Sequence, residues 1–343
     1  MPELPEVQTT VNGLNARIRG LVIADAWTDY GGAYHRGSDT IKDAAYFKKF
    51  TAAVIGARVI RTDRIAKNIL IHIEKRAPRT GAKRGIRQHV ILIHMKMTGH
   101  MMYGRYVFGQ GGLNKNRVEK TSAVAGEWRP APGERPSLSD PFNRFVHFAL
   151  TFSNGHQLVL SDMRKFAKVA LIDEGELGGT AHLADIGPDP LAKGFSFGTF
   201  RERLMRRPTG KVKQVLMDQS VIAGVGNIYG DEALWRAGIH PLERVGNISD
   251  VVLKRLYTAL VRVLRNGIDF GGDSMSDYRN IDGERGRFQE QHRAYRRTGE
   301  RCLKPGCGGT IRRIVIGTRS AHYCDRHQRL VGTNPKATSS SKA

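Results

Sequence analysis

The sequence predicts an α+β protein with a strand-rich N-terminal region, a helical second region and a small C-terminal cysteine and histidine module. Three observations support this order. Short runs of β-branched and aromatic residues, separated by turn residues, recur over residues 54–160. Apolar residues then recur at helical spacing over residues 200–264. The three cysteines, Cys302, Cys307 and Cys324, all lie near the C-terminal end of the chain.

The strand-rich region is expected to be an antiparallel sandwich or barrel, because short strands follow one another closely. The expected strands are residues 54–62, 68–74, 89–94, 145–151 and 156–160. Asn154 and Gly155 predict a hairpin between the last two, since both residues tolerate positive φ. The pattern is interrupted by residues 31–46, 76–87 and 104–141. We interpret the last of these segments as a long surface loop.

A segment with two prolines, residues 183–191, is the expected linker to the helical region. The expected helices are residues 200–205, 212–217, 228–237 and 251–264. Gly238 and Pro241 follow the third of them as stop signals. Residues 333–343 are rich in Ser and Lys and are expected to be disordered.

The charge of the chain indicates a polyanionic partner. Its 343 residues include 55 Lys and Arg against 32 Asp and Glu, which gives a formal net charge of +23. Hydrophobic residues (40%) and charged residues (25%) are close to the globular average, which argues against wholesale disorder. Nucleic acid is therefore the first candidate partner, and a merely soluble basic protein is the alternative.

The sequence also indicates where the protein acts. No apolar run approaches the ~18 residues that a membrane span needs. The first twenty residues hold no apolar core of a secretory signal. An odd, clustered set of cysteines does not look like a disulfide framework. We expect a cytoplasmic protein associated with the nucleoid.

The cysteine module has the spacing of a zinc site. Cys302 and Cys307 form one pair, and Cys324 and His327 form a second pair after a hairpin-sized insert. Zinc prefers four such ligands at tetrahedral corners, and a closed set of four leaves no open position for catalysis. The sequence therefore predicts one structural Zn²⁺, with His322 as a competing fourth ligand.

Two further segments could contact phosphates. A turn at residues 224–226 precedes a helix that Asn227 can cap, and Lys213 lies on the preceding helix. Exposed amides beside such glycines can bind phosphate, although the turn could also simply join two helices. The insert of the zinc module, residues 311–319, is a basic hairpin that would carry arginines to DNA.

The N-terminus offers a nucleophile. Removal of Met1 would expose Pro2 as a secondary amine, and an α-amine is more often neutral at pH 7 than a lysine. A secondary amine that attacks a sugar C1′ gives an iminium ion, the electron sink that a lyase needs. Glu3 is placed to move protons. The alternative is a frayed tail, as at most N-termini.

Taken together, the opening MPELPEV, the segment GVGNIYGDEALWRAGIHP and the four-ligand module resemble the bifunctional formamidopyrimidine-DNA glycosylases. The resemblance runs from Met1 to about Arg329. It implies an N-terminal antiparallel β-sandwich with flanking helices, then a helix–two-turn–helix domain and a zinc finger. The implied divisions are residues 1–182 (sandwich), 183–195 (linker), 196–298 (helix–two-turn–helix with lesion-capping loop), 299–329 (zinc finger) and 330–343 (tail).

The resemblance also assigns roles to matching positions. Pro2 looks like the Schiff-base nucleophile, and Glu3 looks like the general acid/base. Lys67 matches the family's hairpin lysine near the lesion and its phosphate, and Glu6 matches a structural glutamate. Phosphate-contacting positions are matched by Lys213, Asn227 and Arg319.

Base extrusion needs side chains that fill the vacated stack. Met97 fits the family's void-filling methionine, and Arg164 and Phe166 fit the residues that face and replace the orphaned base. Residues 271–278 and 286–288 look like a segment that caps 8-oxoguanine. These matches favour the oxidised-purine branch over the endonuclease VIII branch.

The implied function is base-excision repair. The enzyme is expected to remove 8-oxoguanine and formamidopyrimidines from double-stranded DNA and to nick the strand by β,δ-elimination as an AP lyase, acting as a monomer without a catalytic cofactor. The alternatives are endonuclease VIII-like activity on oxidised pyrimidines and a non-catalytic protein that binds damaged DNA. The chain departs from the family at three places: the four-residue gap before Cys307, His327 in place of a cysteine, and Met163 in place of a proline.

Overall fold

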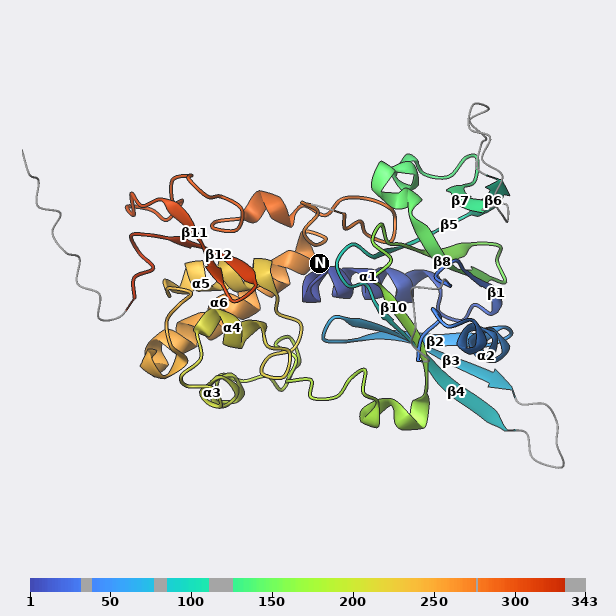
Figure 1. Cartoon of the computed structure of the whole chain (residues 1–343), viewed down its shortest axis with the longest axis horizontal. Coiled ribbons are helices and arrows are strands. Elements are labelled where there is room, and N and C mark those ends of the chain that lie inside the picture. Colours follow the sequence, from blue (N-terminus) through green and yellow to red (C-terminus); the bar gives the residue numbers. More distant parts are fainter. Residues whose placement is uncertain (32–38, 77–84, 111–125, 276, 331–343) are drawn as a thin grey trace, which may run out of the picture. The chain divides into compact units, whose positions relative to one another are not determined.

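The structure is a computed structural model that describes residues 1–31, 39–76, 85–110, 126–275 and 277–330. The chain divides into two compact units (Figure 1). The first unit comprises Met1–Ala184 and Gly267–Gln289, and the second comprises Asp185–Asn266 and the residues from Glu290 onward. The segment expected to cap the lesion thus belongs to the first unit rather than to the helical one.

Two antiparallel sheets form the first unit, as the predicted sandwich requires. One has the order β1-β8-β9-β5 and the other the order β10-β4-β3-β2. The strands of the first sheet are β1 (Ile23–Thr28), β5 (His100–Gly104), β8 (Val146–Phe152) and β9 (Gln157–Ser161). Those of the second are β2 (Arg58–Ile65), β3 (Asn68–Arg76), β4 (Ile86–His94) and β10 (Lys168–Asp173). The predicted α+β class is confirmed, together with its antiparallel strands, helical region and Cys3His cluster.

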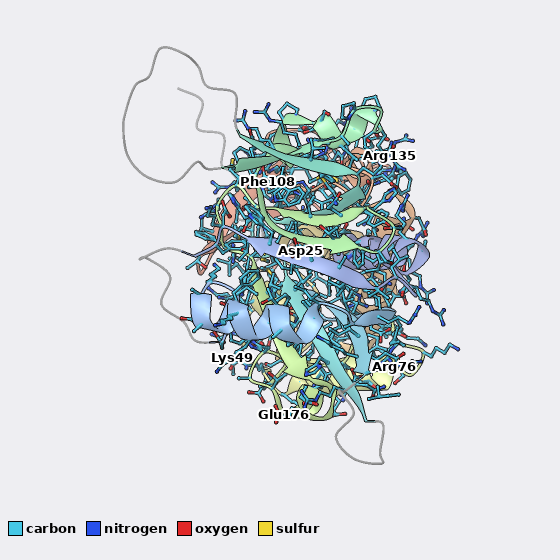
Figure 2. All side chains as sticks on the ribbon, turned by 90° about the vertical axis from the view of Figure 1, so that its right-hand side faces the viewer. Asp25, Lys49, Arg76, Phe108, Arg135 and Glu176 are labelled. Atoms are coloured by element: carbon cyan, nitrogen blue, oxygen red, sulfur yellow. The ribbon has the colours of Figure 1, made fainter. Side chains whose placement is uncertain are left out.

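The sandwich core explains why β3 and β4 read as continuous apolar runs. Ile71 and Ile91 pack with Phe148 of the opposite sheet in the main core. Leu70 and Leu92 face the other way, into a second cluster that Leu177 and Leu183 cover. Both faces of these strands are therefore buried. Charged residues lie on the outside of the unit, as Figure 2 shows for Asp25, Lys49, Arg76 and Glu176.

Two helices flank the sheets. Helix α1 (Leu4–Arg17) begins with a proline in its first turn, and Glu3 and Glu6 form a capping box there. Helix α2 (Ala44–Val54) starts at Asp43, which accepts a hydrogen bond from the Tyr46 amide. The strand expected over residues 54–62 was wrong at its start, because Val54 ends this helix and the strand begins at Arg58.

The long insert is more structured than the sequence suggested. Strands β6 (Tyr106–Gln110) and β7 (Gly126–Pro130) form a hairpin. Two 3-10 turns, Pro136–Ser139 and Pro141–Arg144, follow it. The interpretation of residues 104–141 as one surface loop was therefore wrong for these parts, and residues 111–125 lie outside the described residues, as do 32–38 and 77–84 of the other two segments.

Helices and a two-stranded hairpin form the second unit. The helices are α3 (Phe197–Met205), α4 (Val212–Met217), α5 (Asn227–Ala237) and α6 (Asp250–Asp269), the last of which ends in the first unit. The hairpin consists of β11 (Ile311–Ile316) and β12 (Arg319–Cys324) and packs on α5. No helix within the described ranges is long and apolar enough to cross a membrane. The expected disordered tail, apart from Leu330, lies outside those ranges.

Candidate functional site

The N-terminus is a fixed part of the first unit. Pro2 and Glu3 are buried, and Glu3 is the N-cap residue of α1. The Glu3 amide donates to Glu6 Oε2 at 2.7 Å. Glu6 Oε1 in turn accepts from the Asp273 amide at 2.8 Å, and the Tyr278 hydroxyl donates to the Glu6 carbonyl. Glu6 thus ties the start of α1 to the 271–278 segment, which agrees with the structural role expected for it.

The described residues of the 271–278 segment are held in a tight conformation. Gly272 has φ +88°, and a Cβ there would lie 3.0 Å from Glu6 Cγ. At Gly286, a Cβ would lie 2.2 Å from the Gly272 carbonyl oxygen. The buried Ser274 hydroxyl accepts from the Gly286 amide and donates to the Tyr278 carbonyl. Only glycine fits at both positions, so this segment is built to lie against α1.

Lys67 lies in the turn between β2 and β3. Ala66 has φ +53°, and the Lys67 side chain is buried. Arg64 Nε donates to Gln8 Oε1 of α1 at 2.9 Å, and another nitrogen of Arg64 donates to the Ala66 carbonyl. The turn that carries Lys67 is therefore fastened to the helix that begins just after Pro2 and Glu3.

The turn that carries Lys67 lies beside the end of β4. Burial lowers the pKa of His94 to about 3, with smaller contributions from the Lys96 and Lys67 ammonium groups. His94 pairs with Asn68, the residue after Lys67, across the sheet. The Lys67 ammonium is thus close enough to His94 to disfavour protonation of that imidazole.

A buried carboxylate joins the two loops that carry the expected wedge residues. Asp162 accepts from the Thr98 hydroxyl, next to Met97, and from the Ala167 amide at 2.6 Å. The Arg164 amide donates to the same Thr98 hydroxyl at 3.3 Å. The structure therefore brings the Met97 turn and the 163–166 loop together.

Sequence reasoning did not single out Asp162. The only local signal was its position before a turn, where Asp often accepts from backbone amides. The Tyr30 hydroxyl also donates to it, and burial and the carboxylate together raise the pKa of Tyr30 above its ordinary value.

The side chains of the 163–166 loop point outward. The Phe166 side chain is 47% exposed, and the guanidinium of Arg164 lies 4.4 Å from the centre of its ring. Met97 is half-buried. An exposed aromatic and arginine pair on an ordered loop is typical of a surface that contacts another molecule.

The helical unit has a buried ion network where the sequence suggested a phosphate contact. The Lys213 side chain is only 1% exposed and donates to Asp231 Oδ1 and to the Asn227 carbonyl, both at 2.7 Å. Asp231 Oδ2 accepts from the amide and the Nδ1 of His322. Lys213 is therefore committed to the fold, because its ammonium is buried against a carboxylate, and its placement does not support a direct phosphate contact.

Asn227 is the first residue of α5 rather than its cap. Gly226 occupies the N-cap position, so the expectation that Asn227 caps the helix was wrong. Its Oδ1 is buried and has no hydrogen-bond partner among the described residues. The side-chain carboxamide oxygen of Asn227 thus makes no hydrogen bond that stabilises the fold. The residue lies at the N-terminal end of α5, and helix N-termini bind anions.

Arg319 lies at the tip of the β11–β12 hairpin. Gly317, with φ +61°, and Thr318 form the turn before it. Its side chain is exposed and makes no hydrogen bond or ion pair within the part of the chain that the structure describes. The hairpin itself is anchored to α5 through the bonds from His322 to Asp231.

Four ligand atoms at the base of the hairpin could hold one metal ion. Those of Cys302, Cys307, Cys324 and His327 lie within 4.8 Å of one another. His327 Nδ1 lies 3.6 Å from the Cys302 sulfur and 3.4 Å from the Cys307 sulfur, and the sulfurs of Cys307 and Cys324 are 3.5 Å apart. The Nε2 of His327 faces the Trp235 carbonyl at 3.1 Å, which leaves Nδ1 free to bind. His322, the competing ligand, is instead bonded to Asp231.

Comparisons with known proteins agree along nearly the whole chain. The sequence model described as the formamidopyrimidine-DNA glycosylase N-terminal domain matches residues 1–169, and that described as the formamidopyrimidine-DNA glycosylase H2TH domain matches residues 186–279. The formamidopyrimidine-DNA glycosylase of Rhodospirillum centenum is 35% identical, over 96% of this chain and 100% of the relative. That of Herpetosiphon aurantiacus is 32% identical, over 94% and 98%.

Solved structures give the same result. The complex of Lactococcus lactis Fpg with DNA that contains an abasic site matches with a TM-score of 0.71 and 26% identity, over 95% of this chain and 99% of that one. The MutM (Fpg) protein of Thermus thermophilus matches with a TM-score of 0.69 and 29% identity, over 95% and 98%.

Proposed function

Because the chain belongs to the formamidopyrimidine-DNA glycosylase family, we propose that Pro2 is the nucleophile with which it acts on damaged DNA. The protein is a base-excision repair glycosylase and AP lyase of a family that acts on oxidised purines. The observation that carries the proposal is the position of Pro2. It is buried and ordered directly before the N-cap of α1, and it is not a frayed end.

The reaction begins once Met1 has been removed, since Pro2 then has a secondary amine. The positive end of the α1 dipole favours the neutral, nucleophilic form of that amine. The amine attacks C1′ of the lesion nucleotide and loses its proton, and the base leaves with the electron pair of the glycosidic bond. The nitrogen lone pair then expels O4′, so the C1′–O4′ bond breaks, O4′ takes up a proton and an iminium ion remains. Glu3 exchanges a proton with the opening sugar ring. Lys67 stabilises the negative charge of the lesion phosphate.

Strand cleavage follows from the iminium ion. It acidifies the C2′ proton, so that the bond from C3′ to its phosphate breaks by β-elimination. A second, δ-elimination then breaks the bond from C5′ to its phosphate. The product is a one-nucleotide gap with phosphate at both ends.

The remaining predicted residues bind the DNA. Met97, Arg164 and Phe166 fill the stack that the extruded base leaves, and Asp162 positions both of their loops. Asn227 and Arg319 bind phosphates with their side chains, the carboxamide and the guanidinium, which do not hydrogen-bond to other described residues. Lys213 acts indirectly, because its ammonium holds the Asn227 carbonyl and so fixes the start of α5.

We assign the four-ligand cluster to one structural Zn²⁺. Zinc with Zn–S near 2.3 Å gives tetrahedral edges of about 3.5–3.8 Å, close to the separations of the ligand atoms. When bound, the ion crosslinks the two ligand pairs and takes no part in the reaction. The chain's own residues then present Arg319 from a fixed hairpin. We further propose that the enzyme acts as a monomer on double-stranded DNA in the cytoplasm, at the nucleoid.

Borohydride trapping tests the nucleophile. We expect a covalent adduct with a duplex that contains 8-oxoguanine opposite cytosine. One additional residue before Pro2 should abolish the adduct, because the proline nitrogen becomes an amide, while undamaged-duplex binding is retained. Pro2→Gly should reduce trapping strongly. An unchanged adduct in the extended chain would assign the chemistry to another amine. In a separate test, faster excision from a thymine-glycol duplex than from the 8-oxoguanine duplex would assign the enzyme to the oxidised-pyrimidine branch.

A further inference from the structure

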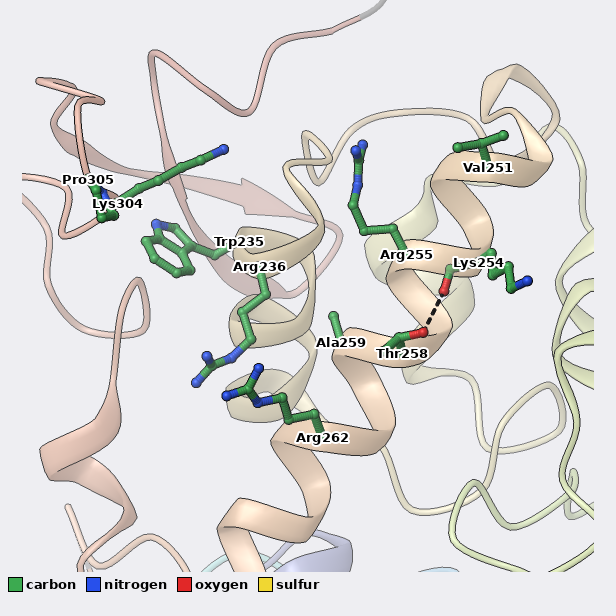
Figure 3. A pocket seen from close by; sticks show the side chains of 10 residues that line it. All are labelled: Trp235, Arg236, Val251, Lys254, Arg255, Thr258, Ala259, Arg262, Lys304 and Pro305. Carbon is green, nitrogen blue, oxygen red and sulfur yellow. Dashed lines mark hydrogen bonds between the residues drawn. The ribbon is translucent and has the colours of Figure 1, made fainter.

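A basic groove of about 620 Å³ lies in the helical unit, and none of its lining residues is among those assigned to DNA or metal above. It is lined by side chains from the C-terminal part of α5, from α6 and from the loop between the first two cysteines (Figure 3). Five of its ten lining residues are cationic: Arg236, Lys254, Arg255, Arg262 and Lys304. Within the described residues, no acidic side chain lines it.

Two of these cations face each other without a direct salt bridge to a carboxylate. Figure 3 shows the guanidinium groups of Arg236 on α5 and Arg262 on α6 side by side. Neither forms a salt bridge among the described residues, and the buried Nε of Arg236 has no hydrogen-bond partner there. Burial lowers the pKa of Arg236, which Glu232 offsets in part, and the charges of Arg262 and Arg293 lower it further.

The Glu232 carboxylate stabilises the charge of Arg236 without forming an ion pair with either arginine. It accepts hydrogen bonds from the backbone amides of residues 293–295 at 2.9–3.0 Å. Two like charges held together with an unused donor are a site for an oxyanion, since a carboxylate bound there would satisfy both guanidinium groups.

Apart from Thr258, the rest of the groove is apolar. Trp235, Ala259 and Pro305 line it, together with Val251, whose side chain is 77% exposed. Trp235 packs against the His327 ring with centroids 5.4 Å apart, so its indole is a fixed wall of the groove. Its buried Nε1 has no partner among the described residues. The groove therefore combines a cationic rim with an apolar surface.

We propose that this groove binds an acidic peptide segment of a partner protein. An apolar side chain of the peptide packs against Trp235 and Val251, and its carboxylates bind Arg236 and Arg262. Charge complementarity carries the choice of occupant. A duplex would contact the cations with its phosphates and leave the apolar surface uncovered, and sites for single strands use projecting aromatic side chains rather than a packed one.

Fluorescence anisotropy with the zinc-loaded full chain tests the proposal. The probe is a fluorescein-labelled peptide of sequence Asp-Asp-Glu-Phe-Asp-Glu, and a second peptide carries Ser in place of Phe. In the variant Arg262→Glu, the new carboxylate can form an ion pair with Arg236. This variant should therefore fold and cleave damaged DNA normally. Arg265→Glu is the matched control, because it makes the same charge change on an exposed position of α6 that does not line the groove.

We expect the Phe peptide to bind, and both Arg262→Glu and the Ser substitution to weaken binding about tenfold or more. Arg265→Glu should change it by no more than about twofold, since a distant exposed charge is screened. No binding, or equal weakening by the two variants, would overturn the proposal. A thymidine oligonucleotide that binds with the same dependence on Arg262 would overturn it in favour of a nucleic-acid site.

Discussion

The substitution Asp231→Asn tests the buried ion network of the helical unit. Asp231 is fully buried, and its carboxylate accepts hydrogen bonds from the Lys213 ammonium and the His322 amide and ring. Asparagine keeps the volume but removes the charge, and its amide nitrogen must face one of these donors. The Lys213 ammonium, 1% exposed, then has no carboxylate to pair with and keeps only neutral acceptors such as the Asn227 carbonyl.

The expected cost is about 3–5 kcal/mol of unfolding free energy, because breaking a buried pair strands one charge. That is a large part of the roughly 5–15 kcal/mol that stabilises a typical domain. Replacing both partners, as Lys213→Met with Asp231→Asn, removes the stranded charge and should restore most of the loss. Glu202→Gln is the control, since its pair with Arg206 is exposed on both sides and should matter by less than about 1 kcal/mol.

Urea unfolding followed by circular dichroism measures these differences. Borohydride trapping on the same samples reports whether the N-terminal chemistry survives in the folded fraction. If the double variant is no more stable than Asp231→Asn, the cost comes from lost hydrogen bonds to His322 and not from the buried charge. If Asp231→Asn costs no more than Glu202→Gln, the network does not hold the unit together.

Three further predictions concern the metal, the wedge loops and pH. His327→Ala should lower the zinc content measured by atomic absorption and weaken DNA binding, whereas His327→Cys should keep both; full zinc in the alanine variant would exclude His327 as a ligand. Asp162→Asn should slow excision of 8-oxoguanine more than cleavage of a preformed abasic site in single-turnover assays, since only excision needs the wedge, and an equal loss of both rates would contradict this. Burial lowers the pKa of His94 to about 3 and that of His100 to about 4. Between these values and 6.5, the unfolded chain binds more protons than the folded chain does. The free energy of unfolding therefore decreases as the pH falls through that window. The loss at pH 5 should be about 2 kcal/mol for each histidine, and urea unfolding at pH 7 and 5 should show a smaller difference in His100→Gln.

Features fixed by neighbouring residues were predictable from the sequence. Helix α4 has the bounds expected from its apolar spacing, and the hairpin at Gly155 forms with φ +77°. The Cys3His set needed only the spacing of two ligand pairs. The long, strongly apolar strands β3 and β4 were found for the same reason.

Elements that depend on distant partners were missed. In strand β1, buried and exposed residues do not alternate, so the period-2 pattern of a strand is absent. In strand β5, all five residues are buried, so this pattern is absent there too. Helix α1 contains Thr, Gly and Asn, so its stability comes from Val7, Val11 and Leu14 packed in the sandwich core rather than from helix propensity. No local pattern reports such packing.

The sequence by itself determined the α+β class and the spacing of a four-ligand cysteine and histidine cluster, and its resemblance to a family supplied the hypothesis that Pro2 is the nucleophile. The tertiary structure alone decided which polar residues are free to act. It buried Lys213 against Asp231, hydrogen-bonded His322 to the same carboxylate, placed His327 beside the three cysteines, and made Asp162 the acceptor that links the Met97 turn to the 163–166 loop. The physical reason is that hydrogen bonds and burial between residues far apart in the chain decide whether a polar group holds the fold or meets the substrate.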